Sequence, residues 1–233
     1  MQVSIRIKVN QKIYLRDPEE SVLGRNIVCN GLLLINKIGF EEFTFKKLAA
    51  EINTTEASIY RYFENKHRLL VYIINWYWCY LEYKILFNLQ NLTDPEVKLK
   101  RMIELLAMPE KETAPDYISE YEAFKLVTWE GSKAYLSRNV SEDNKDKLFK
   151  PYKDLCARFV AMIKEYNPHY KFPHSLASTI IEMAHMQKFF MSNLPSLTDF
   201  GNDKTDKRLL EFLQNLLFDS INQQIKAKQP AKK

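Results

Sequence analysis

The chain has 233 residues, 46% of them hydrophobic and 13% aromatic, which is enough to bury a sizeable core in one large or two modest domains. Five glycines and very little strand-type alternation favour an all-α protein over a β-rich one. The net charge of +5 permits nucleic-acid binding without arguing for it, because bulk charge is weaker evidence than a patterned surface.

Residues 3–15 alternate between apolar and polar side chains, within an N-terminal extended arm or hairpin predicted over residues 1–16. Val3, Ile5, Ile7 and Val9 fall on one side of an extended chain, and Ile13 to Leu15 follow. The alternation predicts a short β-strand or hairpin. One alternative makes this segment a basic arm that reaches the minor groove of DNA, and the other makes it a pair of strands that covers a flank or pairs with another subunit. We favour the second, because a groove-seeking arm is usually flexible and polar. The cations of the first alternative are Arg6, Lys8 and Arg16.

Residues 17–66 predict a three-helix domain. Asp17 and Pro18 form a typical helix start, and the first helix is expected to run to about Ile38. Thr44 is suited to cap the second helix, which has a buried stripe of apolar residues at helical spacing. The stripe consists of Phe45, Leu48, Ala49 and Ile52.

A tight turn and a third helix follow. Asn53 tolerates the left-handed conformation that ends a helix sharply. Thr55 can cap the next helix, which is about two turns long and is anchored to the core by Ile59 and Phe63. Two crossed helices joined by such a turn place the second in the major groove of DNA. The plain alternative is an ordinary helical hairpin with surface tyrosines.

The third helix is expected to present its remaining side chains outward. Small residues at 57 and 58 would let the helix approach base edges, and the tyrosines and cations near its end would serve as donors to phosphates. The acidic Glu56 can accept from a cytosine amino group or exploit the helix N-terminus, and we favour the second use. The outward residues are Glu56, Ala57, Ser58, Tyr60, Arg61 and Tyr62.

Residues 27–70 resemble the DNA-binding domain of TetR/AcrR-type bacterial transcription regulators. The matching elements are Gly39-Phe40, Thr44, Leu48-Ala49, Tyr60-Arg61-Tyr62-Phe63, Lys66 and Leu69. The chain departs from the pattern with Asn53 for the usual turn glycine, Thr54 for an aliphatic residue and Gly31 for a small alanine. The resemblance implies phosphate contacts through Thr44, Tyr60, Tyr62 and Lys66. It also implies a groove face formed by Thr55 to Ser58 and Arg61. We add Lys46 to this DNA-binding set.

The remaining residues predict a helical regulatory domain over 67–226 and a frayed basic tail over 227–233. A helix from about Asn65 to Leu89 is expected to join the three-helix domain to the regulatory domain without a flexible linker. Its apolar run from Leu69 to Leu81 is too short to span a bilayer, so we expect a buried helix. Further helices are expected at 94–108, 116–130, 132–136, 141–166, 174–193 and 204–226.

Two features of the predicted regulatory domain bear on binding, one on contact with a second subunit and one on a small ligand. The last two helices have apolar faces wider than one helix buries on a monomer, and the resemblance implies a four-helix dimer interface, although both helices could simply be internal. The expected interface residues are Ile180, Ile181, Ala184, Leu210, Leu213, Leu217 and Ile221.

The middle helices are rich in aromatic residues. Related regulators bind a small, often apolar ligand between such helices, yet the composition fits a packed core equally well. Polar anchors would be Glu120, Glu182 or His185. The candidate pocket residues are Trp76, Tyr80, Tyr83, Tyr117, Tyr121, Phe124, Phe159, Met162, Met183, His185 and Met186.

No motif indicates catalysis or metal binding. The sequence has no phosphate-binding glycine loop, nucleophile elbow or zinc-protease motif, and its four histidines do not form a ligand set. Cys29, Cys79 and Cys156 are odd in number and far apart, which fits a reducing cytoplasm. We expect no enzyme and no cofactor.

The sequence therefore predicts a homodimeric, ligand-responsive transcription regulator, more often a repressor in this class, that binds a palindromic operator. The first alternative is a DNA-binding regulator controlled by a partner protein instead of a small molecule. The second is a DNA-organising protein without regulation, which would show weak sequence preference and steep salt dependence.

Overall fold

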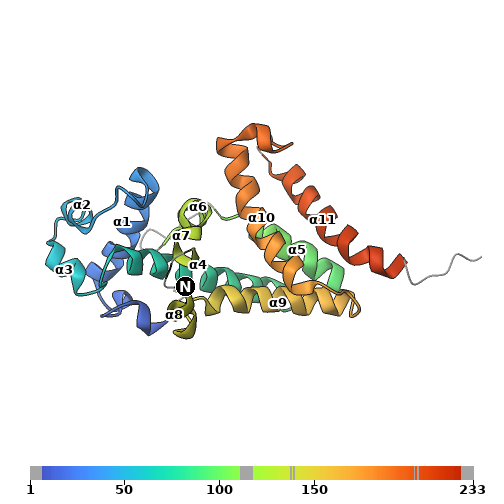
Figure 1. Cartoon of the computed structure of the whole chain (residues 1–233), viewed down its shortest axis with the longest axis horizontal. Helices are drawn as coiled ribbons and strands as arrows, with labels where there is room; N and C mark the ends of the chain where they lie inside the picture. The colour runs from blue at the N-terminus through green and yellow to red at the C-terminus, as the bar shows by residue number, and fades with distance from the viewer. Residues whose placement is uncertain are drawn as a thin grey trace, which may run out of the picture. The chain divides into compact units, whose positions relative to one another are not determined.

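The computed structural model describes residues 7–110, 118–136, 138, 140–201, 203 and 205–226, with only the backbone given for 223–226. Every regular element in these ranges is a helix, so the all-α prediction is confirmed (Figure 1). The chain forms two compact units, Met1–Tyr80 with Pro109–Tyr152 and Leu81–Met108 with Lys153–Lys233. Helices α4 and α9 contribute residues to both.

The first unit contains the predicted three-helix domain. Its helices are α1 (Val22–Ile38), α2 (Phe45–Glu51) and α3 (Glu56–Tyr60), followed by α4 (Lys66–Leu89). Gly31 permits the close approach of α1 and α4, because an added Cβ would lie 2.9 Å from a methyl carbon of Leu69. The core residues of this domain include Ile27, Leu32, Ile35, Phe43, Leu48, Ile59, Phe63 and Leu69.

The start of α1 differs from the prediction. Pro18–Glu20 form a short 3₁₀ helix, η2, whose first turn is capped by the Asp17 carboxylate accepting from the Glu19 N–H at 2.9 Å. The chain then begins α1 with a second cap, in which the Ser21 hydroxyl oxygen accepts from the Gly24 N–H at 2.9 Å. The predicted continuous helix from residue 18 is therefore wrong, although its end at Ile38 is confirmed.

The N-terminal segment is not a strand. Residues 7–15 contain only the 3₁₀ helix η1 (Gln11–Ile13), so the strand prediction is wrong there, and residues 1–6 lie outside the described part of the chain. Ile7, Val9 and Ile13 are nevertheless buried. The alternation thus reflects one buried side of a segment that covers a flank of its unit without a partner strand.

The first unit also includes α6 (Glu120–Glu130), α7 (Ser132–Tyr135) and α8 (Val140–Lys145). Helix α6 packs against α1 and begins later than predicted, at a cap formed by Ser119. The helix predicted over 141–166 is two helices, α8 and α9 (Lys150–Tyr166). Lys147 lies between them with a φ of 61°, a left-handed conformation that no helix continues through.

The second unit is built on α5 (Pro95–Ala107), α10 (Pro173–Asn193) and α11 (Lys207–Lys226), with a short 3₁₀ helix η3 (Pro195–Leu197). These three helices all contact one another. In the first unit, every residue of α4 from Leu69 to Trp78 is buried, as the apolar run predicts. Among the described helices, none is long and apolar enough to cross a bilayer.

Candidate nucleic-acid interface

The helix-turn-helix is formed by the local interactions that the sequence predicts. The Thr44 hydroxyl oxygen accepts from the Lys47 N–H at 3.2 Å and caps α2. The Thr55 hydroxyl oxygen accepts from the Ser58 N–H at 3.2 Å and caps α3. Asn53 adopts a φ of 50° between them. Both caps and the left-handed turn are confirmed.

Helix α3 has one buried and one exposed side. Ile59 is fully buried, whereas Glu56, Ala57 and Arg61 are exposed and Tyr60 is 47% exposed. The Tyr60 ring packs edge-on against Phe45, with 5.0 Å between ring centroids, which holds the phenol at the surface. Thr55, Lys46 and Thr44 are exposed as well, and Ser58 is half-buried.

Tyr62 does not lie where the sequence placed it. Its side chain is 2% exposed, so the prediction that it points outward is wrong. Its hydroxyl lies 2.7 Å from the Ser21 hydroxyl, and its carbonyl accepts from the Leu15 N–H at 2.8 Å. Tyr62 therefore attaches the end of α3, the expected recognition helix, to the N-terminal segment and to α1.

Lys66 also has a structural role. Its ammonium group donates to the carbonyls of Phe40, Glu41 and Phe43 at 2.9, 3.0 and 3.1 Å. An ammonium group has three donors, so these bonds use all of them. The prediction that Lys66 presents a free donor to phosphate is therefore wrong, because the group instead holds the turn between α1 and α2.

Arginine side chains lie at the surface near the end of α3. Arg61 is exposed and, within the described residues, makes no hydrogen bond or ion pair. Arg16 is also exposed, and its guanidinium carbon lies 5.4 Å from the centre of the Tyr62 ring. Sequence reasoning considered Arg16 only as part of an arm, because nothing in the chain order shows that residue 16 returns to the end of the recognition helix.

Comparison with known proteins supports the helix-turn-helix assignment. Residues 31–73 match the family model described as bacterial regulatory proteins, tetR family. Residues 31–73 therefore form a DNA-binding domain of the TetR type. The sequence of the chain matches no curated protein.

Solved structures resemble the chain over most of its length. AibR in complex with isovaleryl coenzyme A and operator DNA shares 16% identity, covers 83% of this chain and 98% of its own, and has a TM-score of 0.60. The fatty acid degradation regulator FadR from Bacillus halodurans shares 19% identity over 82% of this chain and 96% of its own, with a TM-score of 0.55. A protein from Saccharomonospora viridis solved with choline shares 14% identity, and the match covers 85% of this chain and 94% of that protein, with a TM-score of 0.57. At these identities the likeness establishes the fold.

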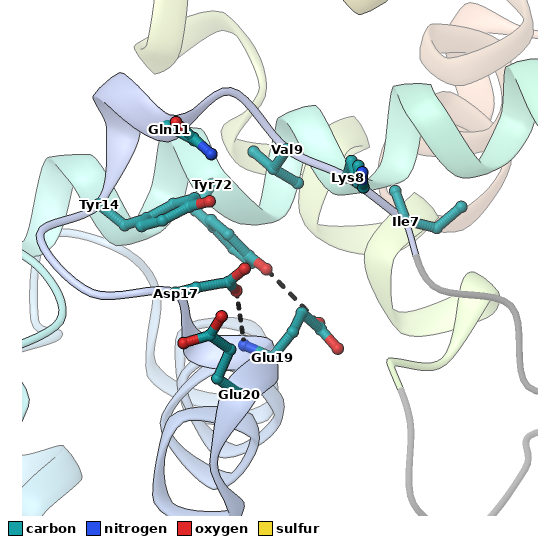
Figure 2. A pocket seen from close by; sticks show the side chains of 9 residues that line it. All are labelled: Ile7, Lys8, Val9, Gln11, Tyr14, Asp17, Glu19, Glu20 and Tyr72. Carbon is teal, nitrogen blue, oxygen red and sulfur yellow. Dashed lines mark hydrogen bonds between the residues drawn. The ribbon is translucent and has the colours of Figure 1, made fainter.

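A cavity of about 260 Å³ lies in the first unit between the N-terminal segment and α4 (Figure 2). The rings of Tyr14 and Tyr72 lie beside it, and the Tyr72 hydroxyl faces the Glu19 carboxylate at 3.5 Å. Its charged lining consists of three carboxylates, from Asp17, Glu19 and Glu20, and one lysine, Lys8. Such a wall repels phosphate, so this flank is unsuited to face the DNA backbone.

The aromatic candidates of the middle helices are divided between the two units. In the first, Trp76 stacks on Tyr80 with 5.1 Å between centroids, Phe124 is buried, and Tyr121 is 40% exposed. In the second, Phe159 and Met162 are buried, Met183 and Met186 are half-buried, and Tyr83 is 39% exposed. Tyr117 lies outside the described residues.

His185 behaves as a core residue. It is 4% exposed, and its Nδ1 lies 2.9 Å from the carbonyl oxygen of Ile181, one turn earlier in α10. Burial lowers the pKa of its imidazole below the usual value. Within the described residues, no group of three or more histidine, cysteine or acidic side chains is arranged to hold a metal ion.

The predicted dimer residues are mostly inside the second unit. Six of them are fully buried, and Leu210 alone is partly accessible, so the assignment of these six to a subunit interface is wrong. The physical reason is that α10 and α11 turn their strongest apolar stripes toward each other and toward α5. The six buried residues are Ile180, Ile181, Ala184, Leu213, Leu217 and Ile221.

Proposed function

We propose that this chain is a homodimeric repressor that binds a palindromic operator through α3 and releases it when a small ligand binds. The observation that carries the proposal is an exposed recognition-helix surface on a confirmed helix-turn-helix. Thr55, Glu56, Ala57, Tyr60 and Arg61 are exposed, while Ile59 on the opposite side is fully buried. A short helix with one anchored and one free side is suited to the major groove.

DNA contacts would divide by chemistry. Arg61 can donate to base edges or to phosphate, and the Tyr60 hydroxyl is held at the surface by Phe45. Lys46 and Thr44, at the start of α2, would contact the backbone, and Arg16 would add a cation beside the end of α3. Tyr62 and Lys66 would support these residues from behind.

A dimer would bring two recognition helices about 34 Å apart, which matches successive major-groove faces. The buried stripes of α10 and α11 leave a second apolar face available for the twofold mate. Phe212 is 38% exposed and Leu194 is 44% exposed, and several neighbours are half-buried. A monomer gains little from exposing such a face, so we assign the subunit contact to it. The half-buried neighbours are Met183, Met186, Phe190, Leu210 and Leu216.

The effector would act by shifting a population between DNA-competent and DNA-incompetent states. AibR has been solved with an acyl coenzyme A and the Saccharomonospora viridis protein with choline, so this fold accommodates ligands of different chemistry. The aromatic residues of α4 and α6 in this chain favour a ligand with an apolar part. The proposal also includes a cytoplasmic location and the absence of enzymatic activity.

The test is operator binding after selection of a site from random DNA. Arg61→Ala and Tyr60→Phe should each weaken binding, by about 5- to 100-fold for Arg61→Ala if it contacts a base. Lys164→Ala removes a similar charge from an exposed position on α9 and serves as the control. If both α3 variants bind like the wild type in a mobility-shift assay, the recognition assignment is wrong. Diffuse binding without a palindrome would favour a DNA-organising protein instead.

A further inference from the structure

The turn between α1 and α2 is held from two sides. Lys66, at the start of α4, donates to three of its carbonyl groups. On the other side, the Glu130 carboxylate at the end of α6 accepts from the Phe40 N–H at 3.0 Å. Gly39 opens this turn with a φ of 79°, and α2 begins at Phe45. The first residues of the helix-turn-helix therefore depend on α6 as well as on α4.

Glu130 is part of a charged chain. It is 8% exposed, and its Oε2 lies 2.9 Å from the Lys133 ammonium of α7. The same ammonium lies 2.8 Å from a carboxylate oxygen of Glu41, within the turn. It also lies 5.7 Å from the centre of the Phe40 ring, while the Lys66 ammonium lies 4.8 Å from that centre. Leaving a buried carboxylate unpaired costs free energy, so we expect Glu130 to keep these partners in the folded state.

Helix α6 is attached to α1 at its other end too. The Asn36 amide donates to the Glu122 backbone oxygen at 2.9 Å and to its carboxylate at 2.7 Å. Because both ends of α6 are bonded to α1 or to the turn after it, a shift of α6 is transmitted directly to this region. No flexible linker separates the turn from α2 and α3.

We propose that α6 positions the recognition helix through a latch formed by Glu130 and Lys133 on Phe40 and Glu41. Glu130 is thus a positioning residue for DNA binding, and a displacement of α6 moves α2 and α3 through this latch. The inference rests on the proposed function and adds a route, through α6, by which the population shift would reach α2 and α3. It requires no contact of the latch residues with DNA.

Glu130→Gln tests the latch with little change in shape. Glutamine keeps an oxygen for the Phe40 N–H but loses the ion pair with Lys133. We expect operator affinity to fall about tenfold, although the variant gains net positive charge, which by itself would favour DNA. Glu96→Gln makes the same charge change and breaks a 2.6 Å pair with Lys100 in the other compact unit. This control should not weaken binding. Glu41→Gln, at an exposed position, should weaken it about threefold.

Hydrogen exchange provides a readout that general destabilisation would not reproduce. In Glu130→Gln, amides of residues 39–63 should exchange faster, whereas those of α5, α10 and α11 should match the wild type. Unchanged operator affinity in Glu130→Gln would overturn the proposal, and so would a uniform rise in exchange over the whole first unit. If the wild type selects no operator, the proposed function fails, and the exchange pattern alone then decides whether the latch exists.

Discussion

The hydroxyl groups of Tyr62 and Ser21 lie 2.7 Å apart, which links the residue after the recognition helix to the cap of α1. Ser21 also accepts from the Gly24 N–H, so one serine both starts α1 and anchors α3. The domain is thereby closed by a polar contact between segments 41 residues apart. The position of α3 consequently depends on the buried Tyr62 and on its contact with Ser21.

Tyr62→Phe should reduce the free energy of unfolding by about 1 kcal/mol, because it removes one buried hydrogen-bonding group. Tyr60→Phe, at an exposed position, should change it by less than about 0.5 kcal/mol. Urea denaturation followed by circular dichroism measures both. A Tyr62→Phe variant that is fully stable but deficient in operator binding would instead indicate a direct DNA contact.

Lys66→Met should destabilise the domain by about 1.5–3 kcal/mol, because three carbonyl groups lose a charged donor. Lys46→Met removes the same charge from an exposed position on α2 and should leave the unfolding free energy unchanged while weakening operator binding. Thermal unfolding and mobility shifts distinguish the two variants. Equal stability of Lys66→Met and the wild type would contradict the structural role.

Phe212→Glu should convert the dimer to a monomer, because it places a charge at the centre of the proposed apolar contact. Phe212 is partly exposed in the single chain, so folding should be retained. Gln90→Glu adds the same charge at an exposed polar position and should remain dimeric. Sedimentation velocity measures the state of both. A dimeric Phe212→Glu variant would place the subunit contact elsewhere.

His185 should make stability depend on pH. Burial lowers the pKa of the folded imidazole, so below about pH 6.5 the unfolded chain binds the extra proton. Stability is therefore complete above this pH and falls as the solution is acidified, by at most about 1.4 kcal/mol per pH unit for one proton.

His185→Gln should remove this part of the pH dependence. His67 also has a lowered pKa, so the relevant quantity is the difference between wild type and variant. His174→Gln, at an exposed position of the same helix, is the control. Unfolding free energies measured at pH 7.5 and 5 test the prediction. It fails if His185→Gln and the wild type lose equal stability on acidification.

Local chemistry predicted much of the fold. Thr44, Asn53 and Thr55 act on residues within one turn of themselves, so their caps and left-handed turn can be read from spacing alone. The points at which a helix begins late or is interrupted were harder to predict. Ser21 starts α1 although Pro18 looks like an adequate start, and Lys147 adopts a left-handed conformation without any glycine to indicate it.

The dimer residues show why periodicity alone is insufficient. A wide apolar face indicates that a helix packs against two other elements, but it does not show which stripe contacts which element. Leu213 and Phe212 are adjacent in sequence, yet one is fully buried and the other is 38% exposed. Helix α5 packs against both α10 and α11, so the partner of each stripe is set by the tertiary arrangement of the three helices.

From residue types and spacing alone, this chain is recognisable as helical and as carrying a helix-turn-helix, because helix caps, turns and apolar stripes are short-range effects. Only the folded molecule decides that Tyr62 and Lys66 support the recognition helix from inside and that Glu130 reaches the turn before it. Those roles depend on contacts between residues 23 to 90 positions apart, and no local rule specifies which distant groups will meet.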